Sequence, residues 1–173
     1  KSLLEFDVIL YGDADPARLG PDAARHIESF VAEFGGGILF LSGVMSNPRS
    51  LATTPLANLL PGGPEDARDP FEQEKANIRM CGYLLTPDGK ASPITQFRDF
   101  RGNAERNLEH WEDRDQRGDG LVGLYWFQRV RKLKAGATVL VEVAGGESTR
   151  PPLFVTQHVG RGRVFWSGTD DTW

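Results

Sequence analysis

A chain of 173 residues with 39% hydrophobic side chains is long enough for one domain with a sizeable core. Its net charge of -4, without a basic stripe or polybasic cluster, argues against nucleic acid or an anionic membrane as a partner. One cysteine, Cys81, excludes an internal disulfide, and no apolar run reaches the roughly 20 residues that span a bilayer. We therefore treat residues 1–173 as one domain that does not itself insert into a membrane.

The first forty residues predict a strand, a helix and a second strand. Residues 6–11 are apolar and rich in β-forming side chains. Apolar residues within 23–34 recur every three or four positions, as on the buried face of a helix, and Gly35 can end that helix in the left-handed conformation. The run 38–41 is apolar without alternation, which is typical of a strand covered on both faces in a parallel sheet. Together these elements predict a βαβ unit.

The middle of the chain is less regular. Residues 83–85 and 92–94 flank a turn signal at 86–90, which predicts an antiparallel pair of short strands. The other elements expected here are two short helices, at 54–60 and 103–111, and two polar loops, at 61–79 and 113–123.

The last third predicts strands. Residues 124–127 and 137–143 are β-rich runs. Residues 153–159 and 163–167 are joined by Gly160-Arg161-Gly162, which predicts a β-hairpin.

Three of the predicted strands end on small or acidic residues, at 11–13, 41–43 and 166–171. If these strands are parallel neighbours, the three ends meet at the edge of the sheet where ligands of open α/β sheets bind. We expect Gly43 to need a positive φ, and the glycines could serve only to let each strand turn. The candidate ligand-binding residues are Asp13, Asp15, Ser42, Gly43, Thr169, Asp170 and Asp171.

Signals for catalysis, metals and cofactors are weak. Ser42 follows a buried strand as a nucleophile would, but the G-x-S-x-G pattern is missing, and His158 lies in a strand beside the hairpin turn. The glycine runs 35–37 and 160–162 each precede a strand instead of opening a helix, so neither fits a phosphate loop. We expect no catalytic residue, metal or cofactor, with Ser42 and His158 as the only catalytic candidates.

Four segments resemble, in this order, the class I glutamine amidotransferase-like superfamily: residues 7–10, the helix end 34–37, the strand 38–43 and the hairpin 160–165. The resemblance implies a flavodoxin-like three-layer α/β/α sandwich. It also implies a mostly parallel central sheet with a C-terminal antiparallel hairpin, and an earlier βα unit upstream of this chain.

Three further segments, 54–61, 124–127 and 167–173, resemble the uncharacterised amidotransferase-like domains of large planctomycete-type membrane proteins. This narrower resemblance implies a soluble domain of a membrane-anchored bacterial protein. Its partners would then be other domains of the same polypeptide or other proteins.

The chain departs from the superfamily at both catalytic positions. The elbow cysteine falls on Leu41 or Ser42, and the late His-Pro-Glu is replaced by His158-Val159-Gly160. We therefore expect a non-catalytic binding or scaffolding domain. Two alternatives stay open: an enzyme of altered chemistry centred on Ser42 with one of the acids Asp13, Asp170 or Asp171, and a domain in which the same groups bind a small polar ligand such as a sugar.

Overall fold

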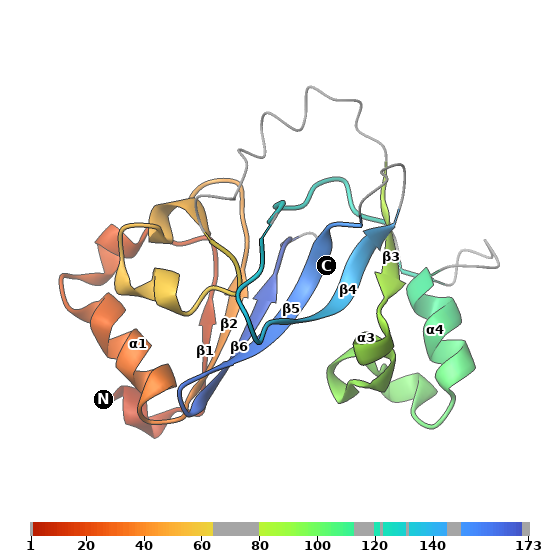
Figure 1. The fold of residues 1–173 in the computed structure, drawn as a ribbon, viewed down its shortest axis with the longest axis horizontal. Coiled ribbons are helices and arrows are strands. Elements are labelled where there is room, and N and C mark those ends of the chain that lie inside the picture. The colour runs from red at the N-terminus through yellow and green to blue at the C-terminus, as the bar shows by residue number, and fades with distance from the viewer. Residues whose placement is uncertain are drawn as a thin grey trace.

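The computed structural model describes residues 2–63, 80–112, 120–121, 123–130, 132–144 and 150–170. It shows a six-stranded mixed sheet with three α-helices, in the strand order β1-β2-β6-β5-β4-β3 (Figure 1). None of the helices in these residues is long and apolar enough to cross a membrane. The bounds are β1 Val8–Tyr11, α1 Ala23–Ala32, β2 Gly37–Leu41, β3 Gly82–Leu85, α3 Pro87–Ala91, α4 Ala104–Glu112, β4 Thr138–Ala144, β5 Pro152–Val159 and β6 Gly162–Ser167.

The prediction of a mostly parallel sheet is wrong for the described strands. β1 pairs with β2 and β2 with β6 in parallel, but β6–β5, β5–β4 and β4–β3 are all antiparallel. The predicted C-terminal hairpin is confirmed as β5–β6. Parallel neighbours need a crossover such as α1, whereas successive strands joined by short links pair antiparallel, as β4, β5 and β6 do.

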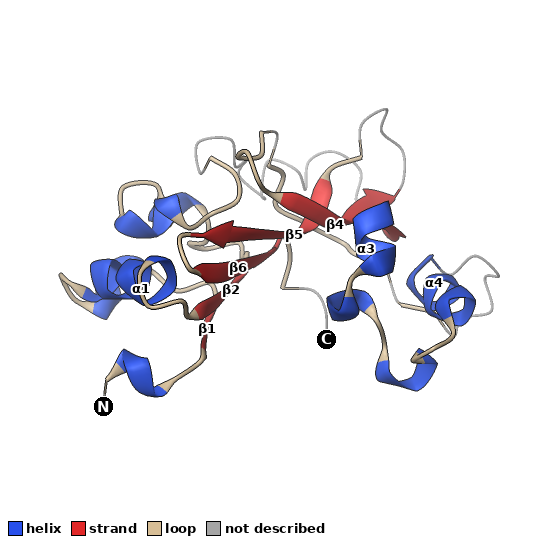
Figure 2. Cartoon of the chain, turned by 60° about the horizontal axis from the view of Figure 1, so that its bottom comes forward, coloured by secondary structure: helices blue, strands red, loops and turns tan. Residues whose placement is uncertain are grey.

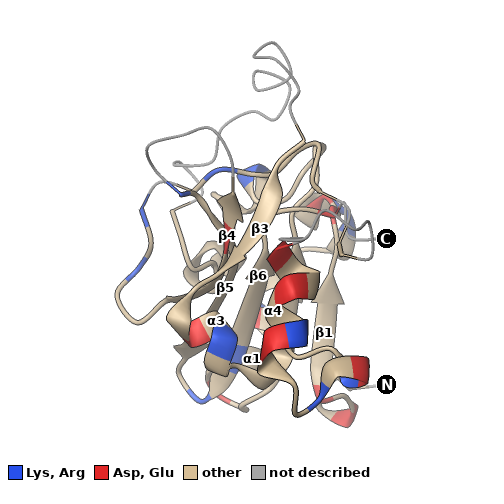
Figure 3. Cartoon of the chain, turned by 90° about the vertical axis from the view of Figure 1, so that its right-hand side faces the viewer, with Lys and Arg blue, Asp and Glu red and all other residues tan. Residues whose placement is uncertain are grey.

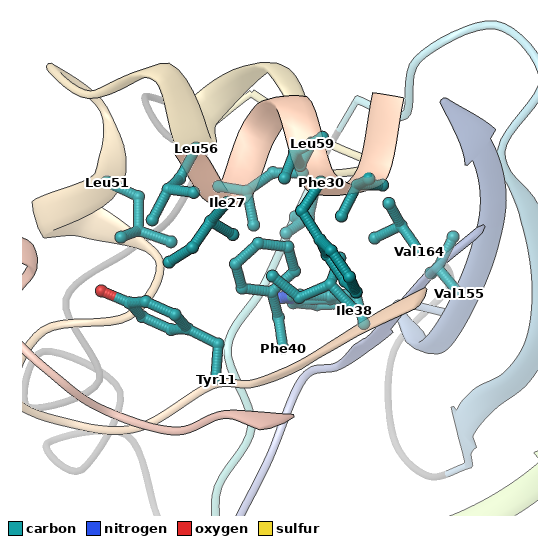
Figure 4. Packing of buried hydrophobic residues seen from close by; sticks show 14 residues of the cluster. Tyr11, Ile27, Phe30, Ile38, Phe40, Leu51, Leu56, Leu59, Val155 and Val164 are labelled. Carbon is teal, nitrogen blue, oxygen red and sulfur yellow. The ribbon is translucent and has the colours of Figure 1, made fainter. Parts of the chain in front are cut away.

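The predicted βαβ unit is confirmed as β1, α1 and β2. One side of α1 buries Ile27, Phe30 and Val31 against Ile38 and Phe40 of β2 (Figure 4). Two short 3-10 helices, Arg49–Leu51 and Pro55–Asn58, extend this layer, the second within the predicted helix 54–60. The apolar periodicity of the sequence thus decides which side of α1 meets the sheet.

The tip of the β5–β6 hairpin closes the C-terminal end of α1. Gly35 has the predicted left-handed conformation, with φ 82°, and its N–H donates to the Val31 carbonyl at 3.2 Å. The Arg161 N–H donates to the Ala32 carbonyl at 2.9 Å, and a Cβ on Gly160 would overlap that same carbonyl. The glycine of the turn is therefore needed for close approach as well as for its φ of 57°.

The predicted antiparallel pair around residues 86–90 is wrong in its second half. Residues 83–85 do lie in β3, but β3 pairs with β4, and residues 92–94 enter a 3-10 helix. The turn signal itself forms α3, because Pro87 stands at the first helical position and the Thr86 hydroxyl accepts the Gly89 N–H at 2.9 Å. Proline and an N-cap threonine start a helix as readily as a turn.

The β-rich run 124–127 is not a strand, which corrects a second prediction. Within it, Leu124 forms an isolated bridge with Cys81, and just after it the Gln128 N–H donates to the Gly168 carbonyl at 2.6 Å. The segment is used to support the chain after β6. The predicted helix 103–111 is confirmed as α4, and most of the predicted loops 61–79 and 113–123 lies outside the described residues.

The two halves of the sheet are covered on opposite faces (Figure 2). Val155, Val164 and Trp166 belong to the core beneath α1. On the other face, Trp111 of α4 packs against Phe154 of β5, with ring centroids 6.1 Å apart. The same face of β1 carries exposed apolar side chains.

Candidate functional site

The ends of β1, β2 and β6 meet at one edge of the sheet, as their parallel pairing requires. The Ser42 N–H, just after β2, donates to the Ser167 carbonyl at the end of β6 at 2.9 Å. Asp13, just after β1, lies against the loop that follows β2. The convergence that the sequence predicts is therefore present, and its chemistry depends on what these residues bind.

Asp13 is bound to the loop after β2. Its Oδ2 accepts the Met45 N–H at 2.7 Å, and its Oδ1 accepts the N–H groups of Ser46 and Asn47 at 2.6 Å each. Three successive backbone donors thus surround one carboxylate, an arrangement that in other proteins forms a nest for an anion. Here the anion is a side chain of the protein itself.

Gly43 is buried where this loop begins. Its φ is not positive, which corrects the expected reason for glycine at this position. A Cβ at Gly43 would overlap the Asp13 carboxyl group. The glycine is needed because the carboxylate approaches the backbone closely.

Ser42 is poorly placed for catalysis. Its residue exposure is 0%, and in the described part of the chain its Oγ has no hydrogen-bond partner. His158 pairs with Arg163 near the start of β6, whereas Ser42 follows the residue that pairs with Ser167 at its end. Four residues of strand separate these positions, about 13 Å at roughly 3.3 Å per residue. Ser42 and His158 therefore lie at opposite ends of the strands.

The chain after β6 is also engaged internally. The Ser167 hydroxyl donates to the Thr169 carbonyl at 2.6 Å, and the Thr169 hydroxyl donates to the Trp126 carbonyl at 3.2 Å. Thr169 is fully buried, and Asp170 is half-buried. Asp171 lies outside the described residues.

Asp15 caps a short 3-10 helix, Pro16–Leu19, by accepting the Ala17 N–H at 2.9 Å. The nearby Tyr11 is buried, and its hydroxyl donates to the Ala14 carbonyl at 3.1 Å. Burial raises the pKa of Tyr11 above its ordinary value, and the Asp15 carboxylate adds to the rise.

Asn47 is the residue of this edge that the sequence did not single out. The side-chain Nδ2 of Asn47 donates to the Leu41 carbonyl at 2.7 Å, and the backbone carbonyl of Asn47 accepts the Gly43 N–H at 3.1 Å. Asn47 thus holds the residues on both sides of Ser42, and its buried Oδ1 has no partner among the described residues. The signal available in the sequence was Ser46-Asn47-Pro48, a cluster of turn-forming residues.

No group of three or more His, Cys, Asp and Glu side chains that could hold a metal ion occurs within the described residues. The polar groups at this edge are instead the backbone N–H groups that donate to Asp13 and the buried hydroxyl of Ser42. This arrangement fixes the ends of three strands, and within the described residues the Ser42 hydroxyl has no base hydrogen-bonded to it.

Neither a protein-family model nor a curated protein matches the sequence. Similarity appears among solved structures, first to the cytoplasmic protein STM1381 from Salmonella typhimurium LT2, with 20% identity and a TM-score of 0.59. The cytoplasmic protein STM3548 from Salmonella typhimurium gives 18% identity and a TM-score of 0.61. Each match covers 97% of this chain, which spans 62% of the length of either protein.

A third similar structure is the exo-β-1,4-mannosidase Op5Man5 from Opitutaceae bacterium strain TAV5, with 18% identity and a TM-score of 0.50. The match covers 98% of this chain and 22% of the enzyme. Identities this low show a shared fold and nothing of function. The six-stranded mixed α/β sheet is consistent with the class I glutamine amidotransferase-like fold.

Proposed function

We propose that this chain is a non-catalytic binding or scaffolding domain of a larger bacterial protein. The observation that carries the proposal is the use of the polar groups at the strand ends inside the fold. Asp13 accepts three backbone N–H groups, and the Ser42 hydroxyl is fully buried without a hydrogen-bonded base. Polar groups engaged in this way hold the loops at the strand ends in place, as a binding or scaffolding domain requires.

The requirements of nucleophilic catalysis support the same proposal. A serine nucleophile must reach its substrate and must pass its proton to a base within about 3 Å. Ser42 is shielded from solvent, and the nearby carboxylate of Asp13 is held by Met45, Ser46 and Asn47. Activation of Ser42 by Asp13 would require this loop to open.

The finer fold is part of the proposal. We place the chain in a flavodoxin-like three-layer sandwich, completed by an earlier βα unit of the same polypeptide beside β1. Two observations support this placement. β1 has only β2 as a neighbour in the described sheet, and its four residues are all apolar, as in strands of the sheet interior. Attachment to a membrane-anchored protein belongs to the same proposal and rests on the sequence resemblance.

The test is an activity and ligand screen on the purified chain beside its Ser42→Ala variant. Release of ammonia from glutamine, hydrolysis of aryl esters and hydrolysis of aryl glycosides are measured for both proteins. We expect no turnover that distinguishes them. A hydrolysis that Ser42→Ala removes would overturn the proposal and favour the enzyme alternative.

A thermal-shift screen with glutamine and simple sugars completes the test. A ligand present at about 100 times its dissociation constant stabilises the folded state by about 2.7 kcal/mol, a readable shift. A sugar that raises the melting temperature, and fails to do so with Asp170→Asn, would favour the small-ligand alternative. No shift with any compound leaves proteins or neighbouring domains as the partners.

A further inference from the structure

One face of the sheet is uncovered along β1. Side chains alternate between the faces of a strand, and Ile9 and Tyr11 belong to the core under α1, so Val8 and Leu10 lie on the opposite face. Val8 is 55% exposed and Leu10 is 72% exposed. Phe6, two residues before Val8, is exposed as well. An apolar surface at the N-terminal strand therefore faces solvent.

This face is covered elsewhere in the sheet. Trp111 of α4 packs on Phe154 of β5, and Phe154 packs on Phe165 of β6 with ring centroids 5.6 Å apart. The α4 layer thus reaches β5 and leaves β1 open (Figure 2). Parallel strands such as β1, β2 and β6 are normally covered on both faces by helices. A helix is therefore the kind of element that normally covers such a face.

The strands on this face carry few charged side chains. At its register positions in β1, β2, β6 and β5, the charged or titratable side chains are Arg163 and His158, which face each other across the hairpin. Both are exposed. In Figure 3, β1 contains no charged residue, while acidic residues gather on α4. In a chain of net charge -4, the strands of this face combine an apolar β1 with the positive charge of Arg163, which His158 faces across the hairpin.

We infer that this face docks an amphipathic α-helix of a protein partner. The apolar side of the helix would cover Val8 and Leu10, and acidic side chains on its flank would lie over Arg163 and His158. Helix-in-groove recognition combines such apolar anchors with complementary charge at the rim. The inference rests on the proposed scaffolding function, for which it names the class of partner. The earlier βα unit proposed above would pair with the free edge of β1, and a right-handed crossover would place its helix on the side of α1, away from this face.

The test uses a synthetic peptide as the probe. It is a labelled helical peptide of about 20 residues, with leucines at three- and four-residue spacing and glutamates along one flank. A twin carries lysine in place of every glutamate. Fluorescence anisotropy should show binding of the glutamate peptide and at least about tenfold weaker binding of the lysine twin.

Variants of the face make the test specific. Leu10→Glu should weaken binding of the glutamate peptide at least about tenfold, and Arg163→Glu should reverse the preference between the twins. Ile94→Glu is the matched control, because Ile94 is 58% exposed in the other half of the chain. All three side chains are exposed, so the variants should keep the wild-type melting temperature.

Three results would overturn the inference. They are equal binding of the two peptides, no binding of either, and binding that Leu10→Glu leaves unchanged. Sedimentation of the chain alone tests another occupant: self-association that Leu10→Glu abolishes would assign this face to a second copy. These results leave the proposed non-catalytic function standing, because that proposal fails only on a hydrolysis or a small ligand assigned to the strand ends.

Discussion

Replacing Asp13 by asparagine tests whether the loop after β2 depends on an internal carboxylate. The side chain accepts N–H groups from Met45, Ser46 and Asn47 at 2.6–2.7 Å. Asparagine has the same shape but carries one oxygen and one amide nitrogen. With its oxygen in place of Oδ1, it retains the bonds from Ser46 and Asn47 and turns an N–H donor toward the donor of Met45.

The expected loss follows from these three bonds. A hydrogen bond to a charged group contributes about 1.5–3 kcal/mol, and a neutral one about 1 kcal/mol. The two retained bonds should each weaken by about 1 kcal/mol, and the bond to Met45 should be lost at about 1.5 kcal/mol, the lower figure because this site is exposed. Asp13→Asn should therefore lower the free energy of unfolding by about 3.5 kcal/mol, equivalent to a fall of about 7–14 °C in the melting temperature.

The assay is urea unfolding followed by circular dichroism, with Asp15→Asn as the matched control. Asp15 is a nearby acid that accepts a single N–H, from Ala17, as a helix cap. Asparagine caps as well as aspartate, so the control should stay within about 0.5 kcal/mol of the wild type. If Asp13→Asn is no less stable than Asp15→Asn, the carboxylate does not hold the loop and our account of this edge is wrong.

Three further predictions concern the same edge. Gly43→Ala should lower the free energy of unfolding by about 2–3 kcal/mol, because its Cβ would overlap Asp13. Gly12→Ala should cost little, because nothing lies within 4 Å of the Cβ added there. Equal melting temperatures of the two variants would refute the overlap. Ser42→Ala should keep or raise the melting temperature by removing an unpaired buried hydroxyl, and a fall of several degrees would mean that the hydroxyl is bonded. Because the pKa of Tyr11 is raised in the folded state, its hydroxyl ionises first in the unfolded chain as the pH passes about 10, so stability present below pH 10 is lost above it. In urea titrations, Tyr11→Phe should therefore lose less stability than the wild type between about pH 8 and pH 11. Equal losses would contradict the pKa shift.

Local patterns in the sequence were sufficient for elements that depend on neighbours in the chain. The spacing of Ile27, Phe30 and Val31 predicts the buried side of α1, and the glycines around Arg161 predict the hairpin turn. The run 124–127 is as rich in β-forming residues as the runs that do form strands, but it forms no strand. Propensity does not state whether a neighbouring strand has a free edge, and that decides pairing.

The sequence predicted that the strand ends meet at one place, but it did not predict the contacts that their residues make there. Parallel pairing brings Asp13, Gly43 and Ser167 to one edge, as their positions after apolar runs suggest. The partners of the Asp13 carboxylate lie more than 30 residues away, and no local spacing encodes such a contact. The need for glycine at position 43 comes from the same distant approach, and so the sequence suggested the wrong cause.

The strand order has a consequence for how the chain is made. β6 comes last among the described strands, yet it lies between β2 and β5 in the sheet. During synthesis, the βαβ unit and the antiparallel strands therefore emerge without the strand that joins them. Until residues 161–167 are available, one edge of β2 has no neighbour, and the C-terminal end of α1 lacks the N–H of Arg161. A ribosome-bound chain halted before residue 161 should thus present an open sheet edge that chaperones can bind, and protection against protease should arise in one late step.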